Sequence, residues 1–305
     1  MHINMIRKKL ENHETKILDL YKQEKISKST LKLIHHQIEK IRETLNNITE
    51  KAYGKDIILE LLSRRLAILN DLIKAITNKN MHDIRALTQE MLDIITEGHS
   101  IDLFLAESSI PQPSLENYHY KEDNELTFFL LYPRSAYLTT DRVGLIAHET
   151  SHIHEIIEKY TESIKSEKRK MGESLADVLG LYVAGPLFAY SLSFVITNDF
   201  GTNCVSKIYD LHPSWIARVT VLRYVNSTLW ETAIFKTVIL ELLDNIFYCG
   251  TPQSSEDSLI AKCMRAYDNH IVEFSKFKID EKRIVRLKNG ESDSLLYRLN
   301  AQYLR

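Results

Sequence analysis

The chain has 305 residues and a formal net charge of −2, from 39 basic and 41 acidic side chains. This length allows two domains and a full hydrophobic core, and the balanced charge gives no reason to expect a nucleic-acid partner. The three cysteines, Cys204, Cys249 and Cys263, are odd in number and widely spaced, which indicates a reducing compartment rather than a disulfide framework. No apolar run follows the basic N-terminal residues, so we expect a cytoplasmic protein.

Residues 1–98 are expected to form a helical bundle or hairpin. They contain no proline and, before Gly98, only one glycine, Gly54. Leucine and isoleucine recur at spacings of three and four over residues 31–48, which predicts a helix with a narrow apolar seam. A second helix is expected after Gly54, and a third from the N-cap residue Asn80 to just before Gly98. The charged outer faces are expected to be solvated, although a protein partner could dock there.

The pattern changes after residue 98. A break at residues 110–113 leads into polar, turn-like residues up to Asn124. The next segment, LTFFLLY at residues 126–132, is rich in aromatic residues and ends at Pro133, which predicts a strand. An exposed edge of this strand could pair with an extended peptide substrate. The alternative is a strand that is covered on both sides.

Residues 142–160, RVGLIAHETSHIHEIIEKY, are expected to form one amphipathic helix because apolar residues recur at helical spacing. The segment contains the H-E-x-x-H motif, with His148 and His152 four residues apart. Two histidines at this spacing lie on one helical face and can bind one metal ion. Glu149 lies next to the first of them, where a base could take a proton from a metal-bound water. This short motif also arises by chance in solvated helices, so a third ligand is needed.

Glu173 is the candidate third ligand. It lies in the sequence GESLAD, 21 residues after His152, and Asp177 follows one helical turn later. Two histidines and one glutamate leave the fourth zinc position for water, which is the catalytic arrangement. Asp177 could hold the second ring nitrogen of a ligating histidine. Under the alternative interpretation, Glu173 only stabilises the start of a helix, and Asp177 is a surface acid.

Residues 178–197 contain no charged side chain, and a stretch of 20 residues matches the thickness of a bilayer. Glycines, tyrosines, serines and Pro186 dilute this stretch, and no basic cluster flanks it. We expect a buried core helix that starts near residue 171 or 173 and is kinked or divided at Pro186, with a membrane span as the alternative. Further helices are expected over residues 211–246 and 255–277, followed by two short elements separated by Gly290.

The motifs together resemble a known class of enzymes. The H-E-x-x-H motif followed by Glu173-x-x-x-Asp177 resembles the gluzincin class of zinc metallopeptidases. The E-S-L-A-D segment and the H-P-x-x-x-x-R segment from His212 to Arg218 are similar to segments of the prenyl-protein and heat-shock membrane endopeptidase family. The resemblance covers roughly residues 126–225.

This resemblance implies a zincin-like metallopeptidase core that hydrolyses peptide bonds in a peptide or protein substrate. One Zn²⁺ per chain would be held by His148, His152 and Glu173. Glu149 would be the general base that accepts a proton from the zinc-activated water.

The resemblance also implies roles for residues outside the ligand set. His212 would lie near the metal, where it steadies the oxyanion or caps the resting site, and Arg218 would anchor its loop. His154 is expected to point away from the ligand face of its helix, as a polar surface residue.

Two alternatives remain open. Glu149-x-x-His152 and Glu116-x-x-His119 are half-motifs of carboxylate-bridged di-iron bundles, which require both copies inside helices and leave His148 without a role. The other alternative is a non-catalytic, zinc-binding helical protein whose N-terminal helices bind a partner.

We predict a mainly α protein with a small β-sheet (α+β). Its N-terminal helical region would comprise residues 1–98. Residues 99–305 would form a zincin-like metallopeptidase domain with a C-terminal helical extension.

Overall fold

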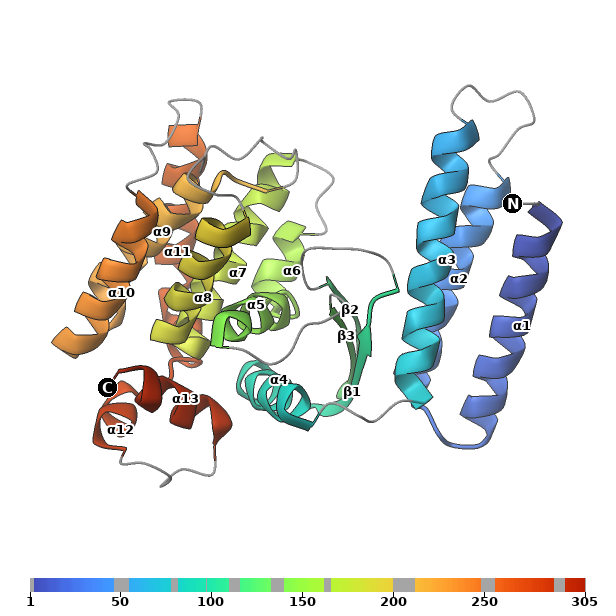
Figure 1. The fold of residues 1–305 in the computed structure, drawn as a ribbon, viewed down its shortest axis with the longest axis horizontal. Coiled ribbons are helices and arrows are strands. Elements are labelled where there is room, and N and C mark those ends of the chain that lie inside the picture. Colours follow the sequence, from blue (N-terminus) through green and yellow to red (C-terminus); the bar gives the residue numbers. More distant parts are fainter. Residues whose placement is uncertain are drawn as a thin grey trace. The chain divides into compact units, whose positions relative to one another are not determined.

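The computed structural model describes residues 3–46, 55–77, 82–96, 98–109, 116–132, 140–161, 166–199, 212–247, 256–287 and 294–304. These residues form a mainly helical protein with one small sheet, as the sequence predicted (Figure 1). The elements, in chain order, are α1 Ile3–Lys22, α2 Lys28–Asn46, α3 Lys55–Thr77, α4 His82–Ile95, β1 Ser100–Glu107, β2 Glu116–Glu122, β3 Glu125–Tyr132, α5 Thr140–Ser151, α6 Glu155–Thr161, α7 Ser166–Ala184, α8 Pro186–Asp199, α9 Trp215–Leu229, α10 Ala233–Phe247, α11 Asp257–Ser275, α12 Glu281–Arg286 and α13 Leu295–Tyr303.

The chain divides into two compact units. The first comprises residues 1–85 and 98–137, and the second comprises residues 86–97 and 138–305. This division differs from the boundary expected near residue 98, because the sheet belongs to the same unit as α1–α3. All the site residues of the H-E-x-x-H, E-S-L-A-D and H-P-x-x-x-x-R segments belong to the second unit.

The first unit is built on the helical periodicity of α1, α2 and α3. The seam predicted in α2 is buried at Ile34, Ile38, Ile41 and Leu45. Burial of these residues against α1 and α3 supplies the hydrophobic stabilisation that a lone helix lacks. Helix α1 was not distinguished as a separate element in the sequence. The predicted positions Ile48, Gly54 and Asn80 lie outside the described residues.

The sheet has the strand order β1-β3-β2, with β3 parallel to β1 and antiparallel to β2. The strand predicted at residues 126–132 is confirmed as β3. The turn-like interpretation of residues up to 124 is wrong for residues 116–122, which form β2. This strand, ENYHYKE, is polar, but Tyr118 and Tyr120 pack against the core of the first unit, and aromatic residues favour strands.

The middle position of β3 decides between the two interpretations of this strand. Both of its edges are paired, from Glu125 to Tyr132 with β1 and from Glu125 to Leu131 with β2. Its backbone groups therefore cannot pair with a peptide, so the proposed exposed edge is wrong. The alternative of a strand covered on both sides is confirmed, and residues 126–132 are all buried.

The segment expected to be one helix over residues 142–160 is two helices. Helix α5 ends at Ser151, and α6 begins at Glu155. The hydroxyls of Thr150 and Ser151 donate to carbonyls one turn earlier, at 2.9 Å to Ile146 O and 2.6 Å to Ala147 O. Hydrogen bonds of this kind bend helices and compete with the regular backbone ladder. We attribute the break directly after Ser151 to these hydroxyls.

His154 lies in the turn between these two helices and is half-buried. Its ring packs edge-on against Phe274 and Phe277, with centroid distances of 5.7 and 5.1 Å. The expectation of a polar surface residue is therefore wrong. The break after Ser151 redirects the chain, so helical geometry no longer places His154 on the outer face.

The apolar stretch at residues 178–197 is divided, as the sequence predicted, and no described helix is long and apolar enough to span a bilayer. Gly185 separates α7 from α8 and has a φ of 59°, which favours glycine. Pro186 is the first residue of α8, where its missing N–H is tolerated. Helix α7 begins at Ser166, earlier than expected, because the charged residues before Glu173 form its first turns.

The C-terminal helices largely follow the predicted ranges. Helix α9 begins at Trp215 with Ser214 as its N-cap, so Pro213 precedes the helix instead of occupying its first turn. Helices α10 and α11 lie within or close to the expected ranges. Helices α12 and α13 lie on either side of residues 288–293, which include Gly290 and are outside the described part of the chain.

Gly144 allows α5 to lie close to α8. A Cβ at this position would be 2.6 Å from Ser191 Cβ and 2.9 Å from the Phe188 carbonyl oxygen, and Gly144 N donates to Ser191 Oγ at 2.8 Å. We expect Gly144→Ala to lower the free energy of unfolding by about 1–3 kcal/mol through overpacking. Urea denaturation would measure this. Adding Ser191→Gly should recover part of the loss, and an unchanged stability in Gly144→Ala would contradict the close approach.

Candidate metal centre

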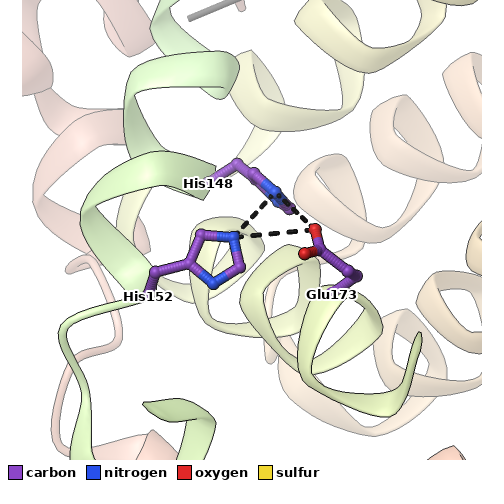
Figure 2. Close-up of side chains that lie close together, drawn as sticks. All are labelled: His148, His152 and Glu173. Atoms are coloured by element: carbon purple, nitrogen blue, oxygen red, sulfur yellow. Dashed lines mark hydrogen bonds and ion pairs between the residues drawn. The ribbon is translucent and has the colours of Figure 1, made fainter. Parts of the chain in front are cut away.

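The site is built where α5 faces α7. His148 lies in the last turn of α5, His152 directly follows the helix end, and Glu173 lies in the middle part of α7. Figure 2 shows the two imidazoles and the carboxylate pointing toward one another. His148 Nε2 is 3.2 Å from His152 Nε2 and 3.3 Å from Glu173 Oε2, and His152 Nε2 is 3.6 Å from Glu173 Oε2. The structure thus brings together the three residues that the sequence predicted as ligands.

These distances match the needs of a tetrahedral ion. Zinc bonds to nitrogen and oxygen are about 2.0–2.2 Å long, which places neighbouring ligand atoms about 3.3 Å apart. Glu173 Oε2 is buried and has no well-oriented hydrogen-bond donor among the described residues, although the ring nitrogens of His148, His152 and His212 lie 3.3–3.6 Å from it. A buried polar atom without a hydrogen-bond partner is costly, and a cation between the three atoms would satisfy it. The residues therefore fit a metal ion.

Asp177 contacts the candidate ligand His148 at the ring nitrogen that faces away from the cluster. Its Oδ1 lies 2.8 Å from His148 Nδ1, so the other nitrogen, Nε2, is directed into the ligand cluster. A carboxylate on the second ring nitrogen is common at metal-binding histidines because it sets the tautomer and the ring orientation. Asp177 is 1% exposed, which excludes the surface-acid interpretation.

Arg218 neutralises Asp177. Its Nε and Nη2 donate to Asp177 Oδ2 and Oδ1 at 2.5 and 2.6 Å, and its guanidinium lies 4.2 Å from the centre of the Trp215 ring. Burial raises the pKa of Asp177, but Arg218 and His148 outweigh this effect and lower the pKa below its usual value. The sequence predicted Arg218 as a loop anchor, and the structure places it one residue from the ligand His148, with Asp177 between them.

His212 lies beside the ligand set. Its Nε2 is 3.3 Å from Glu173 Oε2, although 60 residues separate His212 from His152. Its side chain is 49% exposed, whereas the ligands are almost fully buried. His212 is thus the most solvent-accessible of the groups around Glu173 Oε2.

Glu149 is half-buried and follows His148 in the last turn of α5. Burial lowers the pKa of the Arg218 guanidinium, but Asp177, with smaller contributions from Glu173 and Glu149, raises it above its usual value, so Glu149 lies within electrostatic reach of Arg218. Its predicted role as a base depends on its position next to the first ligand.

The raised pKa of His148 predicts that metal binding releases a proton from this side chain. Burial lowers the pKa of His148, but Asp177 and Glu173 outweigh burial and raise it to about 10. Because the raised value lies well above neutrality, a metal ion must displace a proton from His148 between pH 6 and 8. Zinc affinity should rise roughly tenfold per pH unit in this window.

Isothermal titration calorimetry in buffers with different ionisation enthalpies would count the protons released. We expect at least one proton per zinc at pH 7. Glu173 should release none, because His148 and His212 hold its pKa well below the usual value despite the opposing effect of burial. A zinc affinity that does not change between pH 6 and 8 would contradict this prediction.

The di-iron interpretation is wrong for the second half-motif. Glu116 and His119 lie on strand β2, not on a helix, and residues three apart on a strand point to opposite faces. Glu116 pairs with Arg64 at 3.0 Å, and His119 Nδ1 lies 3.0 Å from Asn117 Oδ1.

Comparisons with known proteins found no match to this chain. No family model, no curated protein and no solved structure matches the chain. The resemblance to the gluzincin class therefore rests on the motif residues alone.

Proposed function

We propose that this protein is a zinc-dependent metallopeptidase that holds one Zn²⁺ per chain between His148, His152 and Glu173. One observation carries the proposal, namely that three ligand atoms, from α5, the turn directly after it and α7, converge at 3.2–3.6 Å in a buried site. The carboxylate of Asp177 behind His148 adds the support that a metal-binding imidazole requires. Two histidines and one glutamate form the ligand set of catalytic zinc sites.

Zinc bound in this way supplies an acidified water and a Lewis acid for a peptide carbonyl. Glu149 would accept the proton of the attacking water and return it to the leaving amine. His212 is half-exposed beside Glu173 and would donate a hydrogen bond to the oxyanion that develops on the substrate. Asp177 and Arg218 would hold His148 in one orientation.

The test is a peptide-library cleavage assay with the zinc-loaded protein. The proposal expects cleavage that disappears after treatment with a chelator and returns when zinc is added. Cleavage that persists in excess chelator would assign the activity to another centre or to a contaminant. A protein that binds zinc and cleaves no peptide would contradict the peptidase proposal.

A second candidate is a non-catalytic, zinc-binding helical protein that acts through a partner, with the helices α1–α3 as the binding region. The proximity of His212 Nε2 to Glu173 Oε2 favours this candidate, because a shift of this half-exposed imidazole toward His148 and His152 would add a fourth ligand and close the site. Closed sites of this kind are structural. Equal function of the wild type and a Glu149→Gln variant in cells, with zinc bound in both, would support this candidate.

A further inference from the structure

The position of His212 requires an explanation. The residue precedes α9 and belongs to no helix, and its side chain is 49% exposed. Its Nε2 nevertheless lies 3.3 Å from Glu173 Oε2. Because about half of this side chain is exposed, the attachment of the neighbouring backbone contributes to its position.

Ser214, two residues after His212, provides this attachment. Its backbone N–H donates to Glu256 Oε1 at 3.0 Å, and its hydroxyl donates to Glu256 Oε2 at 2.5 Å. Both oxygens of one carboxylate are therefore bound by one residue. Hydrogen bonds to a charged acceptor are shorter and stronger than neutral ones, and two together restrict orientation as well as distance.

Ser214 also connects to α9. Its Oγ accepts from Ala217 N at 3.2 Å, and its carbonyl accepts from Arg218 N at 3.1 Å. The residue that Glu256 holds is thus the N-cap of the helix that carries Arg218. Fixing Ser214 orients the first turn of α9 and the short segment back to His212.

Glu256 comes from a different part of the fold, directly before α11. Helix α11 packs against both α7 and α9. Glu256 is therefore attached to the start of a helix that also packs against α7, the helix of the proposed ligand Glu173. A bond from Glu256 to Ser214 ties the His212 segment to the same framework as Glu173.

We propose that Glu256 is a positioning residue of the metal centre, which holds His212 against Glu173 through Ser214. This inference rests on the proposed zinc site, because it assigns to Glu256 the control of the position of His212, which lies beside the proposed ligand Glu173. Glu256 acts only through Ser214 and His212.

The chain offers a matched control in Glu281. Its carboxylate accepts from Glu231 N and Thr232 N, both at 2.8 Å, and from Thr232 Oγ1 at 2.5 Å, at the N-terminus of α10. Glu281 thus makes the same kind of connection between two elements. It is even more buried than Glu256, with 3% exposure, but the helix start that it holds carries no metal-site residue.

The experiment measures the zinc dissociation constant of the full chain by competition with a chromophoric chelator. Glu256→Gln keeps one oxygen that can accept a hydrogen bond but replaces the other with an NH₂ group, which cannot accept from Ser214. We expect Glu256→Gln and His212→Ala each to weaken zinc binding by about tenfold, as is usual when support of a metal ligand is lost. The double variant should bind no more weakly than His212→Ala, and Glu281→Gln should bind like the wild type.

Several outcomes would overturn the inference. The first is wild-type zinc affinity in either Glu256→Gln or His212→Ala. The second is additive losses of affinity in the double variant. The third is an equal loss in Glu281→Gln, which would indicate a general effect of stability. In each of these cases the zinc site itself stands. A wild-type chain that binds no zinc would instead overturn the proposed function and this inference with it. Circular dichroism checks the fold, and Ser214→Ala, which keeps the backbone N–H bond, replaces Glu256→Gln if that variant does not fold.

Discussion

Glu149→Gln is expected to leave zinc binding unchanged and to lower peptide hydrolysis by about 10²–10⁴-fold, the usual contribution of a general base. Glutamine has nearly the same size as glutamate but cannot accept a proton at neutral pH. Glu149 is not part of the converging ligand set, so its loss should not weaken the metal site. The measurements are the turnover number on a cleaved peptide and the zinc content of the same sample.

Glu155→Gln is the control for this experiment. Glu155 lies only six residues further along the chain, at the exposed start of α6, and its replacement removes the same charge. It should keep wild-type turnover. Full hydrolysis by Glu149→Gln would contradict the assignment of the base, whereas loss of zinc from this variant would show that Glu149 supports the metal site directly.

Arg218→Met is expected to lower the free energy of unfolding by about 3 kcal/mol, because it removes two hydrogen bonds and the guanidinium charge from the buried carboxylate of Asp177, which keeps only its contact with His148 among the described residues. Asp177 and Arg218 are 1% and 5% exposed, so water cannot replace the lost donors. Urea denaturation in the presence of chelator measures this effect without a contribution from metal binding. The destabilisation should be largest at neutral pH and decrease as the pH falls below about 4, where Asp177 accepts a proton in the unfolded chain.

The same helix provides the control pair. Arg223 is one turn further along α9 and contacts Asp244 Oδ1 at 2.5 Å, but both side chains are more than a third exposed. Arg223→Met should therefore cost less than about 1 kcal/mol. The double variant Asp177→Asn with Arg218→Met should be more stable than Arg218→Met alone. Similar small losses for Arg218→Met and Arg223→Met would contradict a buried pair.

Several elements could be predicted because the pattern that determines each of them lies within one short segment of the sequence. The apolar seam of α2, the strand β3 and the division at Pro186 depend on periodicity, composition and proline geometry within one segment. The three ligand candidates were also recognisable, because the spacing of H-E-x-x-H and of the E-S-L-A-D segment predicts that each set of groups lies on one side of its segment. The meeting of the two segments in space depends on the packing of α5 against α7, which no local pattern predicts.

Other features depend on partners that are distant in the sequence. Strand β2 is polar, and only its pairing with β3 and the burial of Tyr118 and Tyr120 explain it. The apolar periodicity predicts a helix that continues past Ser151. We attribute the break there to the hydroxyls of Thr150 and Ser151, which donate hydrogen bonds to backbone carbonyls. Glu256 could not be found from sequence, since nothing near it resembles a motif and its partner Ser214 lies 42 residues away. The N-cap preference of Ser214 was the only local signal there.

Binding of one metal ion by His148, His152 and Glu173 can be measured as the zinc content of the chain. Elemental analysis of the purified chain, saturated with zinc and freed of excess by gel filtration, tests it most directly. Glu167→Gln, an exposed change on α7, serves as the control beside Glu173→Gln. We expect one zinc per chain in the wild type and in Glu167→Gln, and a large loss of zinc in Glu173→Gln. Absence of stoichiometric metal in the wild type, or equal zinc in Glu173→Gln, would contradict it.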